Sequence, residues 1–394
     1  MNAGHLTYCT NIHPGESWQS VFENVRTHVL AVKARVSPSA DFGVGLRLSA
    51  EAARELSAPG ELERFRDFLA GNGLYVFTIN GFPYGPFHAQ PVKASVYHPD
   101  WTEAERGRYT SDLSALLAAL LPEGLSGSIS TVPGGFKRDI VSRAQSEQIA
   151  RALLERALDL HAVYERTGKS ITLALEPEPC CFLETTAETL DFFEHELLSR
   201  AAREWLAGQA RVSLDAAESI LRRHVGVCLD TCHAAIEFED ADQTLDRLSA
   251  AGIRIAKLQL STGLRLPEPS PDVLAALRAY DEPVYLHQVV ARTGQGELLR
   301  FEDLPLAMQS PLALGAEEWR VHFHVPLYRQ QLGAFTNTQA FLARILERQR
   351  EAAVTAELEV ETYTWDVLPA EQRQGGVDAS IARELDWVLE RLAP

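Results

Sequence analysis

The chain has 394 residues, of which 46% are hydrophobic and 23% are charged, as in an ordinary globular protein. Its net charge of −17 argues against a protein that binds nucleic acid, because a phosphate backbone requires a basic protein face. It has no apolar run of about 18 residues, the length of a membrane-spanning helix, and no secretory signal at its N-terminus. With an odd number of cysteines as well, the composition predicts a cytoplasmic protein with reduced thiols.

In the first half of the chain, short apolar runs alternate with amphipathic stretches. Strands are expected over residues 7–13, 42–48, 74–80 and 126–132. Helices are expected over residues 16–36, 50–70, 101–121 and 142–166, the second of them broken at Pro59 and Gly60. The loop after the third strand, GFPYGPFH, is rich in glycine, proline and aromatic residues.

The alternation continues in the second half. Strands are expected over residues 171–175, 225–229, 253–260 and 356–362, and helices over 186–226 in two pieces, 242–251, 337–351 and 378–392. Eight strand–helix units in sequence favour an α/β fold of the TIM-barrel type, (β/α)8, over an open doubly wound sheet. No glycine-rich phosphate-binding motif follows the first strand, so a nucleotide-binding fold lacks its signature.

One segment departs from this alternation. About 70 residues separate the seventh strand from the next helix, far more than an ordinary connection. Within it, residues 284–291 and 298–303 flank a turn with two glycines, which predicts a β-hairpin, and a further β-like stretch, RVHFHV, ends at Pro326. We predict one barrel domain over residues 1–394, with residues 264–326 as a cap over its C-terminal mouth.

Acidic residues stand where three of the late strands end. Glu176 ends the fifth strand, Asp230 the sixth, and Glu361 lies near the end of the eighth. In a parallel barrel the catalytic side chains lie at these ends. Glu178 and Glu359 are the alternatives to Glu176 and Glu361, because each lies two residues away on the same strand face.

Several carboxylates in one mouth would repel each other unless a cation neutralised them. His322 and His324 share one face of the RVHFHV stretch, and His233 follows Asp230 by three residues. Carboxylates with imidazole suit Mn²⁺, Co²⁺, Mg²⁺, Fe²⁺ or Zn²⁺, so a divalent metal cofactor is predicted. Such an ion would polarise a carbonyl or hydroxyl group.

Further polar residues near strand ends are candidate substrate contacts: Asn11, His13, Arg47, Lys137 and Gln259. Each has a structural alternative. Asn11 and His13 could instead shape the turn after the first strand, and Arg47 and Lys137 could be solvated charges. We place Gln259 in the mouth rather than Lys257, which precedes it by two residues on the seventh strand.

The motifs LALEPE, CLDTCH, HFHV and ELEVE resemble, strand by strand, the xylose-isomerase-like barrels, which include sugar epimerases, inosose dehydratases and endonuclease IV. The resemblance implies that Glu176, Asp230, His324 and Glu361 hold the metal. It also implies that Glu176 and Glu361 form the acid/base pair, and that His233 contacts the substrate. His322 is added to the expected substrate contacts because it shares the face of His324.

Over nearly the whole chain, TYCTNIHPGESW, TINGFPYG and RVHFHVP narrow the resemblance to the EboE-type metabolite traffic proteins of ebo clusters. There is one departure from the epimerase pattern. The metal histidine of the epimerases lies on strand seven, where this chain has KLQLS with Gln259. Either the later HFH stretch returns to the mouth and supplies the ligand, or the metal site is incomplete.

These observations predict a metal-dependent isomerase or epimerase, or a related dehydratase, that acts on a sugar, polyol or cyclitol. A non-catalytic small-metabolite binding or traffic protein on the same barrel is the alternative. A phosphodiester hydrolase similar to endonuclease IV comes third, because it would need more histidines and a basic face. The predicted partner is a polyol or sugar-like small molecule; homodimerisation and contact with other ebo-cluster proteins stay open.

Overall fold

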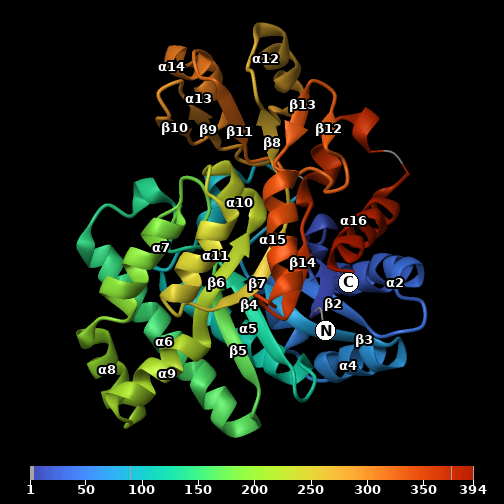
Figure 1. Ribbon diagram of the computed structural model, residues 1–394. Helices are drawn as coiled ribbons and strands as arrows, with labels where there is room; N and C mark the ends of the chain where they lie inside the picture. Colours follow the sequence, from blue (N-terminus) through green and yellow to red (C-terminus); the bar gives the residue numbers. More distant parts are fainter. Residues whose placement is uncertain (1–3, 89, 374, 394) are drawn as a thin grey trace.

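The computed structural model describes residues 4–88, 90–373 and 375–393. A parallel eight-stranded sheet forms the centre, in the order β1-β14-β7-β6-β5-β4-β3-β2. Its strands are β1 (His5–Tyr8), β2 (Phe42–Arg47), β3 (Leu74–Asn80), β4 (Ser126–Thr131), β5 (Ser170–Leu175), β6 (Val225–Asp230), β7 (Ile255–Leu260) and β14 (Glu357–Val360). Helices separate successive strands, which confirms the predicted (β/α)8 barrel (Figure 1).

The barrel closes where β1 meets β2. A single parallel bridge joins Cys9 to Gly45. The Thr7 hydroxyl donates to Gly43 O at 2.7 Å and accepts from Gly45 N at 3.2 Å, so a side chain replaces part of the backbone ladder. The predicted first strand, residues 7–13, is too long, because the chain turns into a 3-10 helix at Thr10–Ile12.

The outer layer consists of helices. The α-helices are α1 (Trp18–Asn24), α2 (Leu30–Val36), α3 (Ala50–Leu56), α4 (Glu61–Gly71), α5 (Ala104–Leu120), α6 (Arg143–Thr167), α7 (Thr186–Phe192), α8 (Arg200–Ala210), α9 (Leu214–His224), α10 (Thr231–Ile236), α11 (Ala241–Ala250), α15 (Gln339–Glu351) and α16 (Val377–Leu392). Short 3-10 helices are η1 (Thr10–Ile12), η3 (Lys93–Tyr97), η4 (Lys137–Asp139), η7 (Tyr363–Val367) and η8 (Ala370–Gln372). Two π-helical turns, η2 (Val25–Val29) and η5 (Phe193–Leu197), interrupt helical stretches that the sequence predicts as regular.

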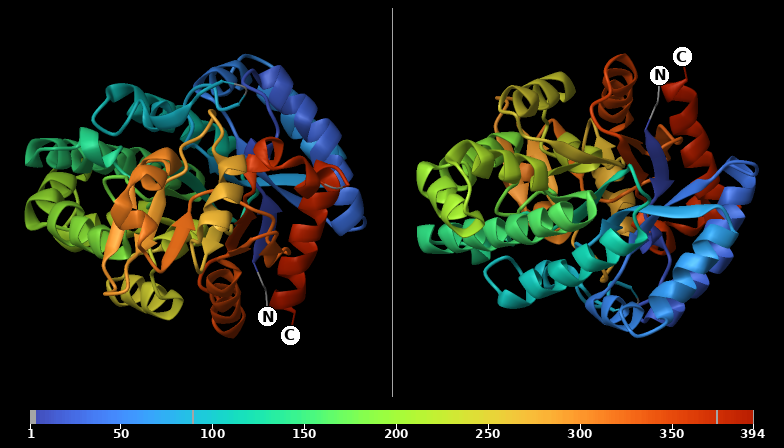
Figure 2. Two further views of the ribbon diagram at one scale, coloured as in Figure 1. Left: turned by 90° about the horizontal axis from the view of Figure 1, so that it is seen from above. Right: turned by 90° about the horizontal axis from the view of Figure 1, so that it is seen from below.

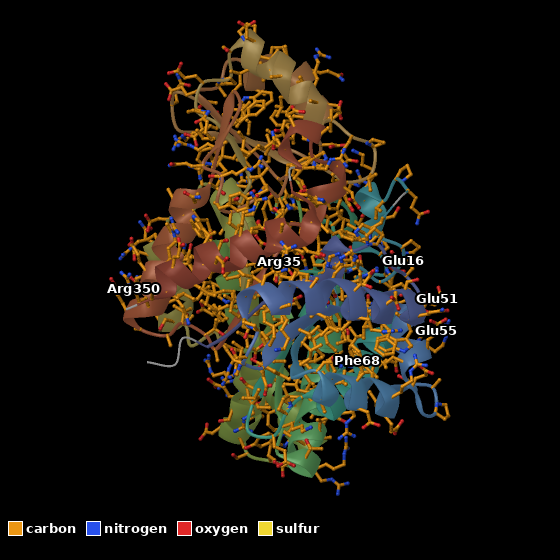
Figure 3. The ribbon with its side chains drawn as sticks, turned by 90° about the vertical axis from the view of Figure 1, so that its right-hand side faces the viewer. Glu16, Arg35, Glu51, Glu55, Phe68 and Arg350 are labelled. Carbon is orange, nitrogen blue, oxygen red and sulfur yellow. The ribbon has the colours of Figure 1, made fainter. Side chains whose placement is uncertain are left out.

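The start of α1 is tied to α3 by a charged group. Ser17 caps α1 by accepting from Ser20 N, and Glu55 Oε2 accepts from Trp18 N at 2.7 Å. Figure 3 shows Glu55 on α3 together with Arg35 on α2 and Phe68 on α4 in this outer layer. At the other end of the chain, α16 packs against β1, and Figure 2 shows the two side by side.

Within the barrel, Lys257 and Glu359 form a fully buried ion pair. Lys257 Nζ lies 2.6 Å from Glu359 Oε2 and donates to Ser130 Oγ at 3.1 Å. Burial lowers the pKa of Lys257 but the charge of Glu359 raises it, and overall this pKa lies above its usual value. A Cβ at position 45 would lie 1.9 Å from Glu359 Oε1, so only glycine leaves room for this carboxylate.

A second sheet stands at the end of the barrel where its strands terminate (Figure 1). It is antiparallel, in the order β10-β9-β11-β8-β13-β12, with β8 (Leu264–Leu266), β9 (Val289–Arg292), β10 (Leu298–Phe301), β11 (Glu318–Val321), β12 (Gln331–Leu332) and β13 (Phe335–Asn337). Helices α12 (Pro271–Leu277), η6 (Arg278–Tyr280), α13 (Leu304–Gln309) and α14 (Pro311–Leu314) accompany it.

The expected hairpin is formed by β9 and β10, with Arg292 opposite Leu298. Strand β11 ends at Val321, so the two histidines of the RVHFHV stretch follow the strand instead of lying on it. The sheet also runs on to Asn337, past the predicted cap boundary at residue 326. The division into one barrel and a cap over residues 264–326 stays a prediction.

Across the described ranges, none of the helices combines the length and the apolar character needed to cross a bilayer.

Candidate active site

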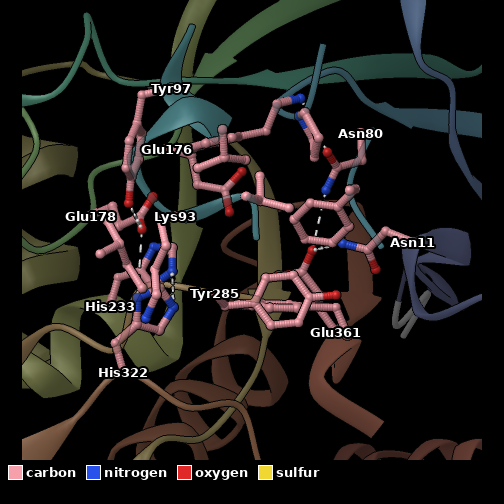
Figure 4. A pocket seen from close by; sticks show the side chains of 17 residues that line it. Asn11, Asn80, Lys93, Tyr97, Glu176, Glu178, His233, Tyr285, His322 and Glu361 are labelled. Atoms are coloured by element: carbon pink, nitrogen blue, oxygen red, sulfur yellow. Dashed lines mark hydrogen bonds and ion pairs between the residues drawn. The ribbon is translucent and has the colours of Figure 1, made fainter. Parts of the chain in front are cut away.

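Two of the three predicted acidic residues at the strand ends line one cavity. Glu176 follows β5 and Glu361 follows β14, and both line a hollow that is partly open to solvent. The other polar side chains around it are Asn11, Asn80, Lys93, Glu178, His233 and His322. Figure 4 shows Glu178, His233 and His322 on one side of the cavity, and Asn11, Asn80 and Glu361 on the other.

Glu176 and Glu361 are buried carboxyls that affect each other's protonation. Burial, and then the charge of Glu361, raises the pKa of Glu176 well above its usual value. Burial also raises the pKa of Glu361, although nearby His324 lowers it. Glu361 Oε1 accepts from Asn11 Nδ2 at 2.7 Å and from Asn80 Nδ2 at 3.2 Å. Each carboxyl can therefore keep a proton more readily than a solvent-exposed carboxyl and exchange it with a bound molecule.

Asp230 is fixed by its position at the start of α10. Its Oδ1 accepts from Cys232 N at 2.7 Å, from His233 N at 3.0 Å and from Ser261 Oγ at 2.6 Å. Its Oδ2 is buried and has no hydrogen-bond partner among the described residues. A buried carboxylate oxygen without a donor is costly, so this atom is available for a cation.

Three imidazole rings gather beside Asp230. His233 Nε2 lies 3.1 Å from His322 Nε2, which lies 3.3 Å from His324 Nε2. Burial, and then the neighbouring His233, holds the pKa of His322 well below its usual value. Burial also lowers the pKa of His324, although Asp230 and Glu361 raise it. His233 and His322 line the cavity, and His324 and Asp230 contact these two rings.

The two acids at the end of β5 differ in their surroundings. Glu178 Oε1 accepts from the Tyr97 hydroxyl at 2.6 Å and from Gln288 Nε2 at 3.0 Å. Glu176 Oε2, by contrast, is buried and has no partner among the residues that the structure describes. Between the alternatives Glu359 and Glu361, only Glu361 lines the cavity, because Glu359 pairs with Lys257 inside the barrel.

Arg47 and Lys137 are not among the cavity-lining residues. The buried Arg47 pairs with Glu16 at 2.8 Å and donates to the carbonyls of Gly15 and Gly85. Lys137 Nζ lies 2.6 Å from a carboxylate oxygen of Glu184 and 2.6 Å from one of Glu188. Both cations are therefore satisfied by protein carboxylates away from the cavity.

His13 and Gln259 also lie outside the lining. His13 stacks on His28, with ring centroids 4.1 Å apart, and its Nε2 lies 3.0 Å from the Tyr8 hydroxyl. Gln259 is fully buried at the end of β7, with Cys228 Sγ 3.8 Å from its Oε1. Of the predicted substrate contacts, Asn11, His233 and His322 reach the cavity.

Several lining residues were not predicted. Asn80 ends β3, so the strand-end rule that selected Glu176 applies to it equally. Lys93 and Tyr97 come from η3 and Tyr285 from the long insertion, and no local pattern marks them. Apolar and aromatic side chains complete the wall: Phe82, Pro83, Phe87, Val92, Val96, Leu286 and Tyr363.

The residues present suit a divalent metal ion. Two buried carboxylate oxygens, Glu176 Oε2 and Asp230 Oδ2, lack partners, and imidazole nitrogens converge beside one of them. Three potential ligand atoms lie within 4.8 Å of one another, one each from Asp230, His233 and His324. Carboxylate and neutral imidazole are the ligands that Zn²⁺, Co²⁺, Fe²⁺ and Mn²⁺ accept.

No known family profile matches the chain. No curated protein matches it either. Among solved structures, the chain is similar to a probable 3-DHS dehydratase, AsbF, from Bacillus anthracis, with 12% identity, a TM-score of 0.47 and 98% of each chain covered. It is also similar to the IolI protein with a bound zinc atom, with 12% identity, a TM-score of 0.47, and 98% of this chain and 97% of that one covered.

A D-tagatose 3-epimerase-like protein gives 11% identity and a TM-score of 0.45, with 98% of this chain and 97% of that one covered. At such identities the likeness concerns the fold alone. The narrower resemblance to EboE-type proteins stays a prediction.

Proposed function

We propose that the protein is a metal-dependent isomerase or epimerase that moves a proton on a sugar, polyol or cyclitol. The observation that carries this proposal is the pair Glu176 and Glu361, two buried carboxyls with raised pKa values that line one cavity. Isomerisation and epimerisation both need one group that removes a proton and another that returns it. The cofactor is a divalent metal, for which the sequence-predicted ligands are Glu176, Asp230, His324 and Glu361.

In this proposal the side chains have separate roles. Asn11 and Asn80 hold Glu361 through its Oε1, while its Oε2 lies 3.7 Å from His324 Nδ1. Burial raises the pKa of both carboxyls, so one of them can remove the substrate proton while the other returns it. When bound, the metal polarises a carbonyl or hydroxyl oxygen of the substrate and so favours loss of the neighbouring proton.

The charges around the cavity favour an uncharged substrate over a phosphorylated one. Of the described residues that line it, Lys93 is the only lysine or arginine. Its Nζ is 2.7 Å from Asp303 Oδ2, an ion pair that neutralises it. A phosphate group would need an unpaired cation or a fork of arginine donors. Carboxylates, amides and imidazoles suit hydroxyl groups instead.

The test is exchange of substrate protons with solvent. We expect the metal-loaded protein to incorporate deuterium from D₂O into at least one member of a panel of ketoses, aldoses and cyclitols, as observed by NMR. Absence of exchange across the panel, with metal bound, would count against the proposal.

A binding or traffic protein is the second candidate. One observation favours it: the amide of Gln259 occupies the end of β7, where epimerases place a metal-binding histidine. This candidate predicts that a polyol binds tightly without exchange, and that Glu361→Gln leaves the binding unchanged.

A further inference from the structure

The three histidines at the mouth converge through the same ring atom. His233 comes from α10, directly after β6, whereas His322 and His324 follow β11 of the second sheet. Their Nε2 atoms are separated by 3.1 Å between His233 and His322, and by 3.3 Å between His322 and His324. All three rings are buried, with exposed fractions of 4%, 3% and 0%. Elements that are distant in sequence thus place the Nε2 atoms of His233 and His324 on either side of His322 Nε2.

The other nitrogen of each ring fixes the tautomer. His233 Nδ1 lies 3.0 Å from Pro177 O, and His324 Nδ1 lies 3.0 Å from Glu361 O. A carbonyl oxygen only accepts, so in both neutral rings Nδ1 carries the hydrogen and Nε2 keeps its lone pair.

His322 reaches the same state through Gln288. The Gln288 Nε2 donates to the Tyr97 hydroxyl at 2.8 Å and to Glu178 Oε1 at 3.0 Å. That orients the amide so that its Oε1 lies 2.8 Å from His322 Nδ1 and accepts the hydrogen there. The Nε2 lone pair of His322 therefore meets those of His233 and His324, and no hydrogen is left to bridge them.

Such an arrangement is unfavourable unless a cation stands between the nitrogens. In a tetrahedral site with metal–nitrogen bonds of about 2.0–2.1 Å, neighbouring ligand nitrogens lie about 3.3–3.4 Å apart. The observed separations of 3.1 and 3.3 Å are close to this edge length. A hydrogen bond from Nδ1 to an oxygen is also the usual support of a metal-binding imidazole.

Asp230 is the candidate fourth ligand, because it groups with His233 and His324. Asp230 Oδ2 lies 3.9 Å from His233 Nε2 and has no hydrogen-bond partner among the described residues. Its other oxygen is held by three donors, which fixes the direction of the free one.

We infer that His233, His322 and His324 bind one dication through Nε2, with Asp230 Oδ2 as the fourth ligand. Three imidazoles select Zn²⁺, Co²⁺, Ni²⁺ or Cu²⁺ over Mg²⁺. The inference rests on the proposed function for the presence of a metal at the mouth, and changes which residues hold it. Glu176 and Glu361 are then free carboxyls that handle the proton, instead of ligands that must also act as acid and base.

The experiment counts nitrogens on the metal. The untagged, metal-free protein is loaded with one equivalent of Cu²⁺, and the nitrogen couplings are measured by electron paramagnetic resonance; Co²⁺ affinity is measured by titration of its visible absorption. We expect three nitrogens in the wild type and two in His322→Gln. We also expect Co²⁺ to bind His322→Gln more weakly than the wild type by about tenfold to a hundredfold or more. Loss of a residue that only supports a metal ligand already weakens binding by about that range.

Matched variants separate the alternatives. His161→Gln, on the outer helix α6, should leave the spectrum and the affinity unchanged. Glu176→Gln and Glu361→Gln should each change Co²⁺ affinity by less than about threefold if imidazoles hold the metal. Thermal unfolding of every variant checks that each one is folded.

The outcomes distinguish this inference from the proposed function. One coupled nitrogen, with affinity lost in Glu176→Gln, would overturn the imidazole site and leave a metal-dependent isomerase on the carboxylate ligands. Three nitrogens without solvent exchange on any substrate would establish the site and refute the isomerase. Failure of Cu²⁺, Co²⁺ and Zn²⁺ to bind would overturn the inference outright.

Discussion

Glu361→Gln is expected to lower the rate of solvent exchange on the substrate by on the order of 10²–10⁴-fold, the usual contribution of a positioned acid or base. The glutamine oxygen can still accept from Asn11 and Asn80, which donate to Glu361 Oε1 in the wild type. The site geometry is therefore kept while the proton-carrying oxygen is lost. The measurement is deuterium incorporation by NMR, with the substrate that the wild type exchanges fastest.

Glu178→Gln is the matched control. Glu178 lines the same cavity, but its Oε1 is engaged by Tyr97 and Gln288. We expect it to slow exchange by less than about tenfold. If both variants slow the exchange equally, the exchange rate depends on the total charge of the mouth and not on Glu361 as the base. Wild-type exchange in Glu361→Gln would remove Glu361 from the mechanism.

Lys257→Met is expected to destabilise the protein by about 3–5 kcal/mol, because it leaves the carboxylate of Glu359 buried without its partner. Both side chains of the pair are 0% exposed, so water cannot replace the lost ammonium. The close approach of Glu359 Oε1 to Gly45 also prevents the carboxylate from moving away on that side. Urea unfolding at neutral pH measures the loss.

The double variant Lys257→Met with Glu359→Gln separates charge from packing. It removes both charges, and we expect it to recover more than half of the stability lost in the single variant. If Lys257→Met lowers the free energy of unfolding by less than about 1 kcal/mol, the buried ion pair contributes little to the stability of the barrel. If the double variant recovers nothing, the loss comes from packing around the lysine stem.

The sequence predicted the barrel and the acidic residues of its mouth because both follow from local pattern. Apolar runs at regular intervals imply eight parallel strands, and parallel strands bring Glu176, Asp230 and Glu361 to one end. Alternation placed His322 and His324 together, and their Nε2 atoms do converge, although both residues lie just beyond β11 instead of on it.

The remaining features depend on contacts between distant segments. Lys137 looked like an anion contact because its partners, Glu184 and Glu188, lie on another loop and helix. Gln288, which orients His322, lies in the long insertion and has no distinguishing neighbours in sequence. Pairing of buried polar groups is set by three-dimensional geometry, which hydrophobic periodicity does not encode.

Metal content tests the central claim most directly. Elemental analysis of untagged protein should find about one transition-metal ion per chain in the wild type, and little or none in Asp230→Ala. Asp230→Asn is measured beside it, because the amide keeps an oxygen for the N-cap of α10 and so separates loss of the ligand from loss of the helix start. A wild-type protein that is purified without metal and takes up neither Mn²⁺, Co²⁺ nor Zn²⁺ would contradict a metal-dependent site at this mouth.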